Sequence, residues 1–527
     1  MATAALTVGH VRVNDSNANT GWGNYNKGGG APAAEGQIAY QGSPRLAVGT
    51  KVNATTDREG VTYDAGTTQD VSAGDKLVLL KVNVSDNADV DPVWGVEVAI
   101  GSAEGAHYEY VAAGSAANND AHTFYNAVGG IAGSYLFLAI DPSVAEWREL
   151  TVGSPVLTAV DFYAVGAEFV DGQAKSENVA MDAIDIGTGL TYTGATFSFQ
   201  DAIDFDQDTE ANRYGWAAAV GSVLFLRGVH VVSATGIDTS TVIFPDGYHS
   251  TGLFGITANS TDLTLAGSYE CLGRAYTTTD TRGDLICTGT GDKLTGSFKN
   301  WRLIELNSTA ELTGVAECAE LTQAGGLISG ATVTTRSLAG VATLDDPDFT
   351  NLDNTDFIQG ESGHAIEITT PGTYTLSAIG TSGYGADGTT SAFVYNNSGG
   401  AVTLALADGT VTTDITVRNG AGASTTLENT VTLRVVANDS AGSPIAGARV
   451  YLVAAAGGPE TVGVVLLEGI TDALGVVETT AYNFLSNQPV TGRVRKGSVS
   501  PLYKTAPLGG SIDANGYSQT VFMTLDE

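Results

Sequence analysis

The residues whose types and spacing could do chemistry are carboxylates. Four of them stand at alternate positions in one short acidic stretch: Asp204, Asp206, Asp208 and Glu210. Alternating carboxylate oxygens are what a calcium-binding loop supplies. The stretch differs from the EF-hand loop at two positions. Thr209 stands at the sixth position, where the loop has a glycine, and Gly215 stands at the twelfth, where the loop has a bidentate glutamate. A solvated acidic turn is the alternative interpretation. Calcium is therefore the one metal that the sequence suggests, and we expect no other cofactor.

Carboxylates beside aromatic rings would point to glycan cleavage, which needs two carboxyl groups flanking a bound sugar. The candidates are Asp246 near Tyr248, Glu270 near Tyr269, and Glu361 or Glu367 near Tyr374. None is marked by its spacing, and of the five Trp residues only Trp301 lies within 241–427. The six histidines are scattered, and no nucleophile elbow or phosphate-binding loop is present. The sequence therefore predicts no catalytic residue and a protein that is not an enzyme.

The charge balance restricts the partners. The chain has 58 acidic and 24 basic residues, for a net charge of −34. Such a surface repels nucleic-acid phosphates and anionic membranes. The sequence also lacks the run of about 18 apolar residues that a membrane-spanning helix requires. We therefore expect neither nucleic-acid binding nor membrane insertion.

Cysteine content and the start of the chain bear on where the protein works. Cys271, Cys287 and Cys318 are an odd number and make no disulfide framework, so we expect small buried apolar residues. The opening Met1–His10 lacks the basic segment and apolar core of a secretion signal. The composition is nevertheless typical of an extracellular β-protein. This combination favours assembly in a host cytoplasm and release inside a larger particle, such as a virus.

The elements that must position these residues are predicted to be β-strands. Gly is abundant with 67 residues, Pro is scarce with 13, and only 16% of residues are charged. Threonine, which supplies much of the polar surface, favours strands, while Gly, Asn and Asp favour turns. No segment shows a long helical apolar stripe. The predicted class is all-β.

Internal repetition is clearest within residues 363–427. Two segments there each contain a short alternating strand, a Gly-containing turn and a second strand ending in Thr-Leu. Ala365 to Ala392 is 27 residues, and Leu376 to Leu404 is 28. A near-constant offset indicates stacked repeats, because one such unit cannot bury its apolar face alone.

We therefore expect a central parallel β-helix, or solenoid, over 241–427. Similar Leu-Thr segments recur there at uneven spacing, and the alternative is coincidence in a Thr- and Gly-rich chain. Alternation along strands predicts five inward-pointing residues: Ile366, Ile368, Leu376, Val394 and Leu404. Ala392–Tyr395 and Ala401–Leu406 are expected to offer flat faces to a symmetry mate.

The flanking regions lack the repeat. Residues 1–175 contain short strands joined by Gly-, Asn- and Asp-rich loops, which predicts a jelly-roll-like β-sandwich and a candidate particle-attachment domain. Residues 176–240 are interpreted as a bridging segment into the solenoid. At about residue 428 the pattern changes again, and 428–527 is predicted to form a second β-sandwich.

Two turns carry a resemblance in the C-terminal hundred residues. Gly442-Ser-Pro-Ile-Ala-Gly-Ala448 and Thr471-Asp-Ala-Leu-Gly475 are separated by strand-like segments. This order resembles the bacterial immunoglobulin-like and carboxypeptidase-regulatory-like families. The resemblance implies an immunoglobulin-like β-sandwich that serves as a spacer or attachment module without catalysis.

A second resemblance concerns the repeats. Four segments carry it: Gly363–Tyr374, Gly383–Thr390, Tyr395–Thr403 and Val417–Ala423. They are similar to segments of structural proteins from tailed bacteriophages in which a solenoid precedes an immunoglobulin-like module. The similarity is greatest over 363–427 and smaller over 181–362.

The phage resemblance implies a virion protein of the tail-fibre, tailspike or capsid-decoration type. Other virion proteins of the capsid or tail, and a host-surface glycan or receptor, would be its partners, and a homotrimer its oligomeric state. Two other functions stay open from the sequence. One is a tailspike glycan depolymerase, either a glycosidase or a lyase. The other is a cellular surface adhesin.

Overall fold

The computed structural model confirms the all-β class. Strands make up 60% of the chain and helices 3%. Two compact units divide the chain, Met1–Gly326 and Leu327–Glu527. The described residues are 2–14, 22–27, 35–40, 43–48, 58–84, 96–111, 135–167, 179–207, 215–245, 251–275, 280–385, 390–407, 410, 415–484 and 487–526. Within them, no helix is long and apolar enough to cross a membrane.

The first unit begins with two antiparallel sheets. The first sheet, ordered β10-β7-β13-β5-β4 with β2 also on β13, has the strands β2 (Val11–Asn14), β4 (Glu35–Tyr40), β5 (Ser43–Val48), β7 (Leu77–Val84), β10 (Tyr135–Ile140) and β13 (Val179–Gly187). The second, ordered β11-β9-β8-β12-β6-β3, has β3 (Trp22–Lys27), β6 (Arg58–Gln69), β8 (Val96–Ala103), β9 (Ala106–Val111), β11 (Leu150–Val152) and β12 (Val160–Ala167). Two short 3-10 helices, Ala145–Trp147 and Leu157–Ala159, lie between strands.

One hydrophobic core joins these two sheets. Leu80 and Ile184 from the first sheet belong to the same buried cluster as Ile100 and Val165 from the second. Because β13 pairs with β7 on one side and with β2 and β5 on the other, it is an internal strand of the first sheet. The antiparallel part therefore extends to Gly187. This differs from the prediction that 176–240 is only a bridging segment.

Parallel strands follow in the first unit and form three series. The first contains β14 (Gly189–Gly194), β17 (Val229–Ala234), β20 (Gly255–Ala258) and β23 (Asp284–Cys287). The second contains β16 (Val223–Leu226), β19 (Thr241–Phe244) and β22 (Ser268–Cys271), and the third β18 (Gly236–Asp238), β21 (Leu263–Leu265), β24 (Lys293–Leu294) and β26 (Glu311–Leu312). The long strands β25 (Ser297–Asn307) and β27 (Val315–Ala324) extend the first two series. We call each repeat a rung.

Rung length in this stack is uneven. Gly255 lies opposite Asp284, Asp284 opposite Leu303, and Leu303 opposite Glu320, so successive rungs take 29, 19 and 17 residues. The strand register is maintained by close backbone approach. At Gly255, which has φ +129°, an added Cβ would lie 2.0 Å from the carbonyl oxygen of Asp284. Turns of different length between rungs account for the uneven spacing in the sequence.

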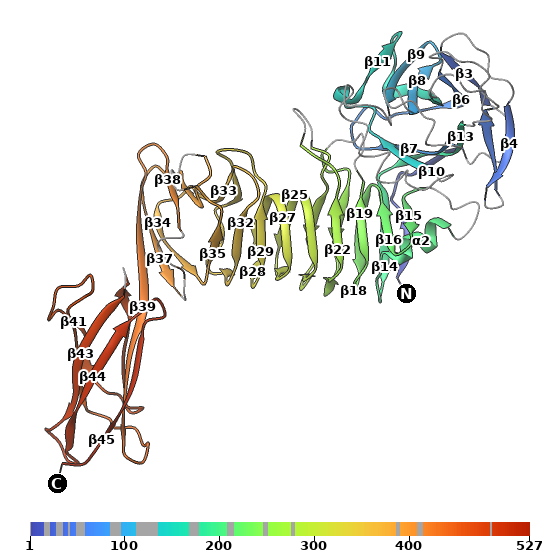
Figure 1. Cartoon of the computed structure of the whole chain (residues 1–527). Helices are drawn as coiled ribbons and strands as arrows, with labels where there is room; N and C mark the ends of the chain where they lie inside the picture. Colours follow the sequence, from blue (N-terminus) through green and yellow to red (C-terminus); the bar gives the residue numbers. More distant parts are fainter. Residues whose placement is uncertain are drawn as a thin grey trace. The chain divides into compact units, whose positions relative to one another are not determined.

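The stack of the first unit starts near Gly189, well before the predicted residue 241. Its first strands carry antiparallel partners, since β1 (Thr3–Leu6) pairs with β14 and β15 (Ala217–Val220) with β16. Helix α2 (Gln200–Gln207) lies beside β15 in Figure 1. These elements cover backbone edges that would otherwise be open to pairing with other chains.

The second unit has its own parallel strands, again in three series. They are β28 (Leu327–Ser329), β31 (Leu352–Asp353), β34 (Gly372–Ser377) and β37 (Ala401–Ala407); β29 (Thr332–Thr335), β32 (Asp356–Gln359) and β35 (Gly380–Ser382); and β30 (Ala342–Asp345), β33 (His364–Ile368), β36 (Val394–Asn396) and β38 (Val417–Asn419). All five residues predicted to point inward are 0% exposed, which confirms the alternation.

The register of the second unit differs slightly from the sequence offset. Ile366 lies opposite Val394, and Leu376 lies opposite Leu406, not Leu404. A shift of two residues keeps the same side chains inward, so the pattern alone could not distinguish the two registers. Val394 and Leu404 are wholly buried. The prediction of flat apolar faces along Ala392–Tyr395 and Ala401–Leu406 is therefore wrong, because their large aliphatic side chains fill the interior.

One strand joins this stack to the C-terminal sheets. Strand β39 (Ser424–Asp439) is parallel to β37 as far as Asn429, and from Thr430 it pairs antiparallel with β42. The sheets are β42-β39-β45 and β41-β40-β43-β44, with β40 (Arg449–Ala454), β41 (Val465–Ile470), β42 (Val476–Asn483), β43 (Gln488–Lys496), β44 (Tyr503–Ile512) and β45 (Tyr517–Met523). Both contribute to one buried cluster. A continuous strand thus crosses the predicted boundary at 427/428.

Candidate functional site

The acidic stretch proposed for calcium lies largely on a helix. Asp204 and Asp206 belong to α2, and because they are two residues apart they point to different sides. Asp204 is exposed, whereas Asp206 is buried. The two carboxylates therefore do not converge, and the predicted loop arrangement is wrong for them. Asp208 and Glu210 lie outside the described residues.

A capping box explains why a helix forms here. The backbone N–H of Gln200 donates to the Ser198 hydroxyl at 3.2 Å, and the N–H of Ser198 donates to Asp201 Oδ2 at 3.2 Å. This Ser-x-x-Asp pattern marks a helix N-terminus. It was readable in the sequence and outweighs the alternating acidic pattern that follows it.

Asp206 uses its carboxylate to hold the chain after the helix. It accepts N–H bonds from Gly215 at 3.0 Å and from Ala217 at 3.1 Å. Its charge also acts on the wholly buried Arg227, where burial lowers the pKa to about 9 and Asp206 opposes that fall. Among the residues that the structure describes, no three His, Cys, Asp or Glu side chains are grouped to hold a metal ion.

Two of the aromatic residues considered for sugar binding, Tyr269 and Trp301, lie inside the first unit. Tyr269 is 0% exposed, and its hydroxyl donates to Asp238 Oδ1 at 2.7 Å. Trp301 is also buried and donates from Nε1 to the Tyr269 carbonyl at 3.2 Å. Glu270 is the next residue on β22, so alternation turns it to the opposite face. These rings therefore belong to the core and cannot stack on a ligand.

The other proposed carboxylate–tyrosine pairs are not assembled as expected. Glu361 forms an ion pair with Arg336, with 3.3 Å between Nη1 and Oε1. Tyr374 packs against Phe349, with ring centroids 4.7 Å apart. Glu367 belongs to a different cluster, described below, and Asp246 with Tyr248 lies outside the described residues. The sequence thus identified carboxylates and tyrosines that form polar or aromatic contacts, but it did not show which residues they contact.

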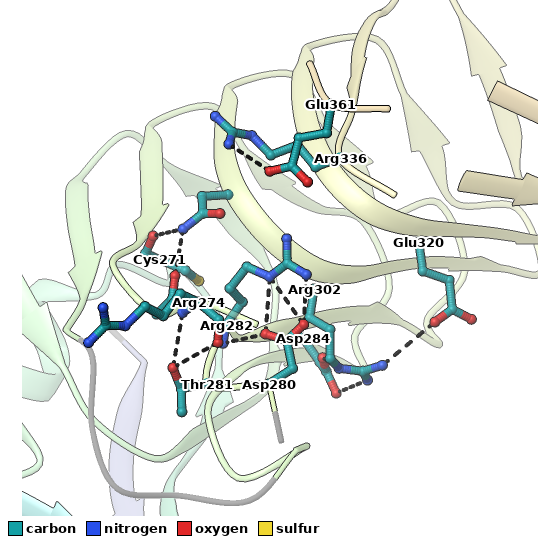
Figure 2. A network of polar contacts seen from close by, with 12 residues as sticks. Cys271, Arg274, Asp280, Thr281, Arg282, Asp284, Arg302, Glu320, Arg336 and Glu361 are labelled. Carbon is teal, nitrogen blue, oxygen red and sulfur yellow. Dashed lines mark hydrogen bonds and ion pairs between the residues drawn. The ribbon is translucent and has the colours of Figure 1, made fainter. Parts of the chain in front are cut away.

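An acid–arginine network crosses three strands of the first unit (Figure 2). Asp284 on β23 and Glu320 on β27 both lie opposite Leu303 of β25. The adjacent Arg302 donates to Asp284 at 2.7 Å from Nε and 2.5 Å from Nη2, and it lies 3.6 Å from Glu320. A guanidinium thus bridges carboxylates from neighbouring rungs.

Burial sets the electrostatics of this network. It raises the pKa of Asp284, and the hydrogen bonds and charge of Arg302 oppose that rise. Burial acts most strongly on Arg302 and lowers its pKa, but the hydrogen bonds to Asp284 and the charges of Asp284, Glu320 and Asp280 together outweigh burial, so the pKa is raised. A second pair, Arg282 with Asp280, has its closest contact at 2.7 Å. Carboxylates that are paired in this way stabilise the fold through ion pairs and are not available as a free acid and base.

The three cysteines lie in the same unit and are buried, as predicted. Cys271, Cys287 and Cys318 are buried and form no disulfide. Burial raises the pKa of each thiol, that of Cys318 to about 12. Because the thiolate is the reactive form, these residues are small core side chains.

The second unit contains a polar group whose members are linked by ring contacts and hydrogen bonds. We call it the Tyr395 cluster, and its members are His364, Glu367, Tyr395, Asn397 and Arg418. Glu367, Tyr395 and Arg418 lie opposite one another on three neighbouring strands, β33, β36 and β38. The guanidinium carbon of Arg418 lies 4.2 Å from the centroid of the Tyr395 ring. The His364 ring is stacked on Tyr395 at 5.2 Å.

Hydrogen bonds fix the groups of this cluster. Arg418 Nη1 donates to His364 Nε2 at 3.0 Å, and His364 Nδ1 donates to the Ala392 carbonyl at 2.9 Å. Because a guanidinium only donates and a carbonyl only accepts, His364 is neutral with its proton on Nδ1. Burial lowers the pKa of His364 further from its ordinary value. Asn397 accepts from the Tyr395 hydroxyl at 3.1 Å and donates to Glu367 at 2.8 Å.

Comparisons with known proteins give little guidance. No family model and no curated protein matches this chain. The solution structure of CtCBM11 is similar over 34% of this chain and 95% of that chain, at 14% sequence identity and a TM-score of 0.22. A TM-score this low carries no argument about fold or function. The comparisons assign no family.

Proposed function

We propose that this protein is a non-catalytic structural component of a tailed-phage particle, of the fibre, spike or capsid-decoration type. In this proposal the antiparallel sheets of the first unit are a jelly-roll-like β-sandwich for particle attachment. The parallel stacks are a β-helix, and the C-terminal sheets are an immunoglobulin-like domain. The protein would assemble in the host cytoplasm and reside in the virion, beside other capsid or tail proteins.

The observation that best supports the proposal is that polar side chains form hydrogen bonds and ion pairs between neighbouring rungs. Residues that could do chemistry are instead bonded between rungs, as Arg302 is to Asp284. In the second unit, Asn396 on β36 donates to Thr425 on β39 at 2.9 Å and to the Ser424 carbonyl at 3.0 Å. Such ladders stabilise a repetitive rod without creating a reactive centre.

The continuous strand β39 supports a display role. A flexible linker between two domains allows them to move relative to each other. Here the strand that pairs with β37 up to Asn429 enters the C-terminal sheet at Thr430 without a break. The last rung and the C-terminal sheets therefore share one continuous strand, which suits a module held at a fixed position.

A homotrimer is proposed from the phage resemblance alone, since the apolar faces expected to pack between copies are buried. The net charge of −34 opposes association, and salt screens that repulsion. Sedimentation should therefore show trimers whose association constant increases as ionic strength rises. A species near 54 kDa at every salt concentration would exclude self-association as the assembly mode.

Fractionation tests the particle assignment. Particles released by lysis of the host that carries the gene would be purified on a density gradient and probed with antibody against this chain. We expect the chain to co-sediment with intact particles and to be labelled by immunogold on their surface. Recovery only in the cell-envelope fraction would favour a surface adhesin and overturn the proposal.

A release assay tests the non-catalytic part. Purified protein would be incubated with host capsule and lipopolysaccharide, and new reducing ends or unsaturated sugars would be measured. We expect no release above that of heat-denatured protein. Cleavage would support the depolymerase alternative, whether or not the chain is found on particles.

A further inference from the structure

Arg418, like Arg148, lies over a tyrosine ring, whereas many other described arginines pair with a carboxylate. Many described arginines form an ion pair with a carboxylate: Arg12 with Asp185, Arg282 with Asp280, Arg302 with Asp284, Arg336 with Glu361, Arg434 with Glu478 and Arg449 with Glu468. Arg418 instead contacts the neutral His364 and the Tyr395 ring. No carboxylate within the described ranges pairs with it. In a chain with 58 acidic residues, an arginine without a carboxylate partner among the described residues is a candidate for binding an anionic ligand.

The guanidinium of Arg418 is held in a fixed position. His364 accepts one of its five N–H groups, and the Tyr395 ring supports its plane at 4.2 Å. The side chain is only half-buried, so its other N–H groups reach solvent. A guanidinium that is already oriented loses little entropy when it binds a carboxylate through two parallel bonds. The geometry therefore favours a planar monoanion.

The surroundings indicate what kind of molecule carries that anion. Tyr395 is half-buried and offers aromatic surface, and the exposed Asn397 adds an amide that suits hydroxyl groups. Glu367, opposite Tyr395 in the strand register, contributes a negative charge that disfavours a doubly charged phosphate. A hydroxyl-rich ligand with one carboxylate fits this combination of groups.

We propose that the Tyr395 cluster is a binding site for an acidic glycan, in which Arg418 pairs with the carboxylate of a uronate sugar beside Tyr395. The high negative charge of the chain disfavours a densely charged polyanion, whereas screening over about 8 Å at physiological salt lets the local cation act. Of the carboxylates considered for catalysis, this site contains only Glu367, which is bonded to Asn397. It stands independently of whether the chain belongs to a particle.

Saturation-transfer NMR on the full-length chain tests the site. The probes are methyl galacturonoside, which carries one carboxylate, and its neutral counterpart, methyl galactoside. We expect transfer to the ring protons of the uronate, with binding at least about tenfold weaker for the neutral sugar, since a charge-assisted pair is lost. Absence of uronate binding, or equal binding of the neutral sugar, would overturn the proposal.

Variants locate the binding. Arg418→Gln should weaken methyl galacturonoside binding about tenfold or more. Arg418→Lys should weaken it less, because lysine keeps the charge but cannot donate two parallel hydrogen bonds to the carboxylate. Arg434→Gln is the matched control, since it removes an exposed arginine of the same unit. Thermal melting would verify folding, and Arg418→Lys serves if the Gln variant does not fold. Unchanged binding in the Arg418 variants would refute the site, as would Arg418-dependent capture of poly-glutamate without uronate binding.

Discussion

His230 is predicted to make the first unit lose stability in mild acid. It lies wholly buried on β17, and its Nε2 donates to the Arg227 carbonyl at 3.0 Å. Because that carbonyl can only accept, Nδ1 of the neutral ring accepts from the Tyr192 hydroxyl at 2.6 Å. Burial lowers the pKa of His230 from 6.5 to about 3. The folded unit therefore needs this histidine uncharged.

The magnitude follows from proton linkage. Below pH 6.5 the unfolded chain binds a proton at His230, but the folded chain does not until the pH approaches 3, so stability falls as pH falls through this window. At pH 5, which is 1.5 units below the unfolded value, the loss is about 2 kcal/mol, because each unit is worth 1.36 kcal/mol. The loss is absent at pH 7 and above.

Hydrogen exchange of peptides covering β17 measures this loss. His230→Gln is the reference, since its amide can donate to Arg227 and accept from Tyr192 without titrating. Wild type and variant would be compared at each pH, so that the intrinsic exchange rate cancels. Between pH 7 and pH 5, protection of the wild type should fall about 30-fold relative to the variant. An unchanged ratio would refute the assignment of His230 as a buried neutral residue.

Three further outcomes follow from the packing. Ile368→Asp should cost several kcal/mol, since it buries an unpaired charge, and an unchanged thermal melt would show that the side chain is not inside. Arg302→Gln should lower the free energy of unfolding measured in urea by about 2 kcal/mol, because Asp284 loses two charge-assisted bonds, and a further Asp284→Asn change should recover part of that loss. The fragment 428–527 should fold alone as a monomer, because its sheets form one core. An amide NMR spectrum with the narrow chemical-shift dispersion of an unfolded chain would contradict this.

Alternation and composition allowed part of the fold to be predicted. The inward positions of Ile366 and Ile368 follow from period-two patterning, and both are buried. Burial of the cysteines followed from their number and type. The register between rungs could not be predicted in the same way. Turn length varies between repeats, and a two-residue slip leaves the pattern unchanged, as at Leu376.

Other features required local signals that compete with the overall pattern. The capping box at Ser198 makes α2 a helix where the acidic residues suggested a loop. A change in the residue pattern led to a predicted domain boundary at 428, but strand β39 crosses it, because one strand can pair within two sheets. The Tyr395 cluster was beyond prediction from the sequence, since His364 and Arg418 are brought together only by the stacking of rungs.

The most direct test of the central claim is a reconstruction of the particle released by the host that carries this gene, at a resolution that shows individual strands. The account predicts density on the particle surface into which the parallel rungs and the sheets joined by β39 can each be fitted. A complete reconstruction in which neither unit finds density, from particles that contain no trace of the chain by mass spectrometry, would contradict the claim that this protein is a structural part of a virion.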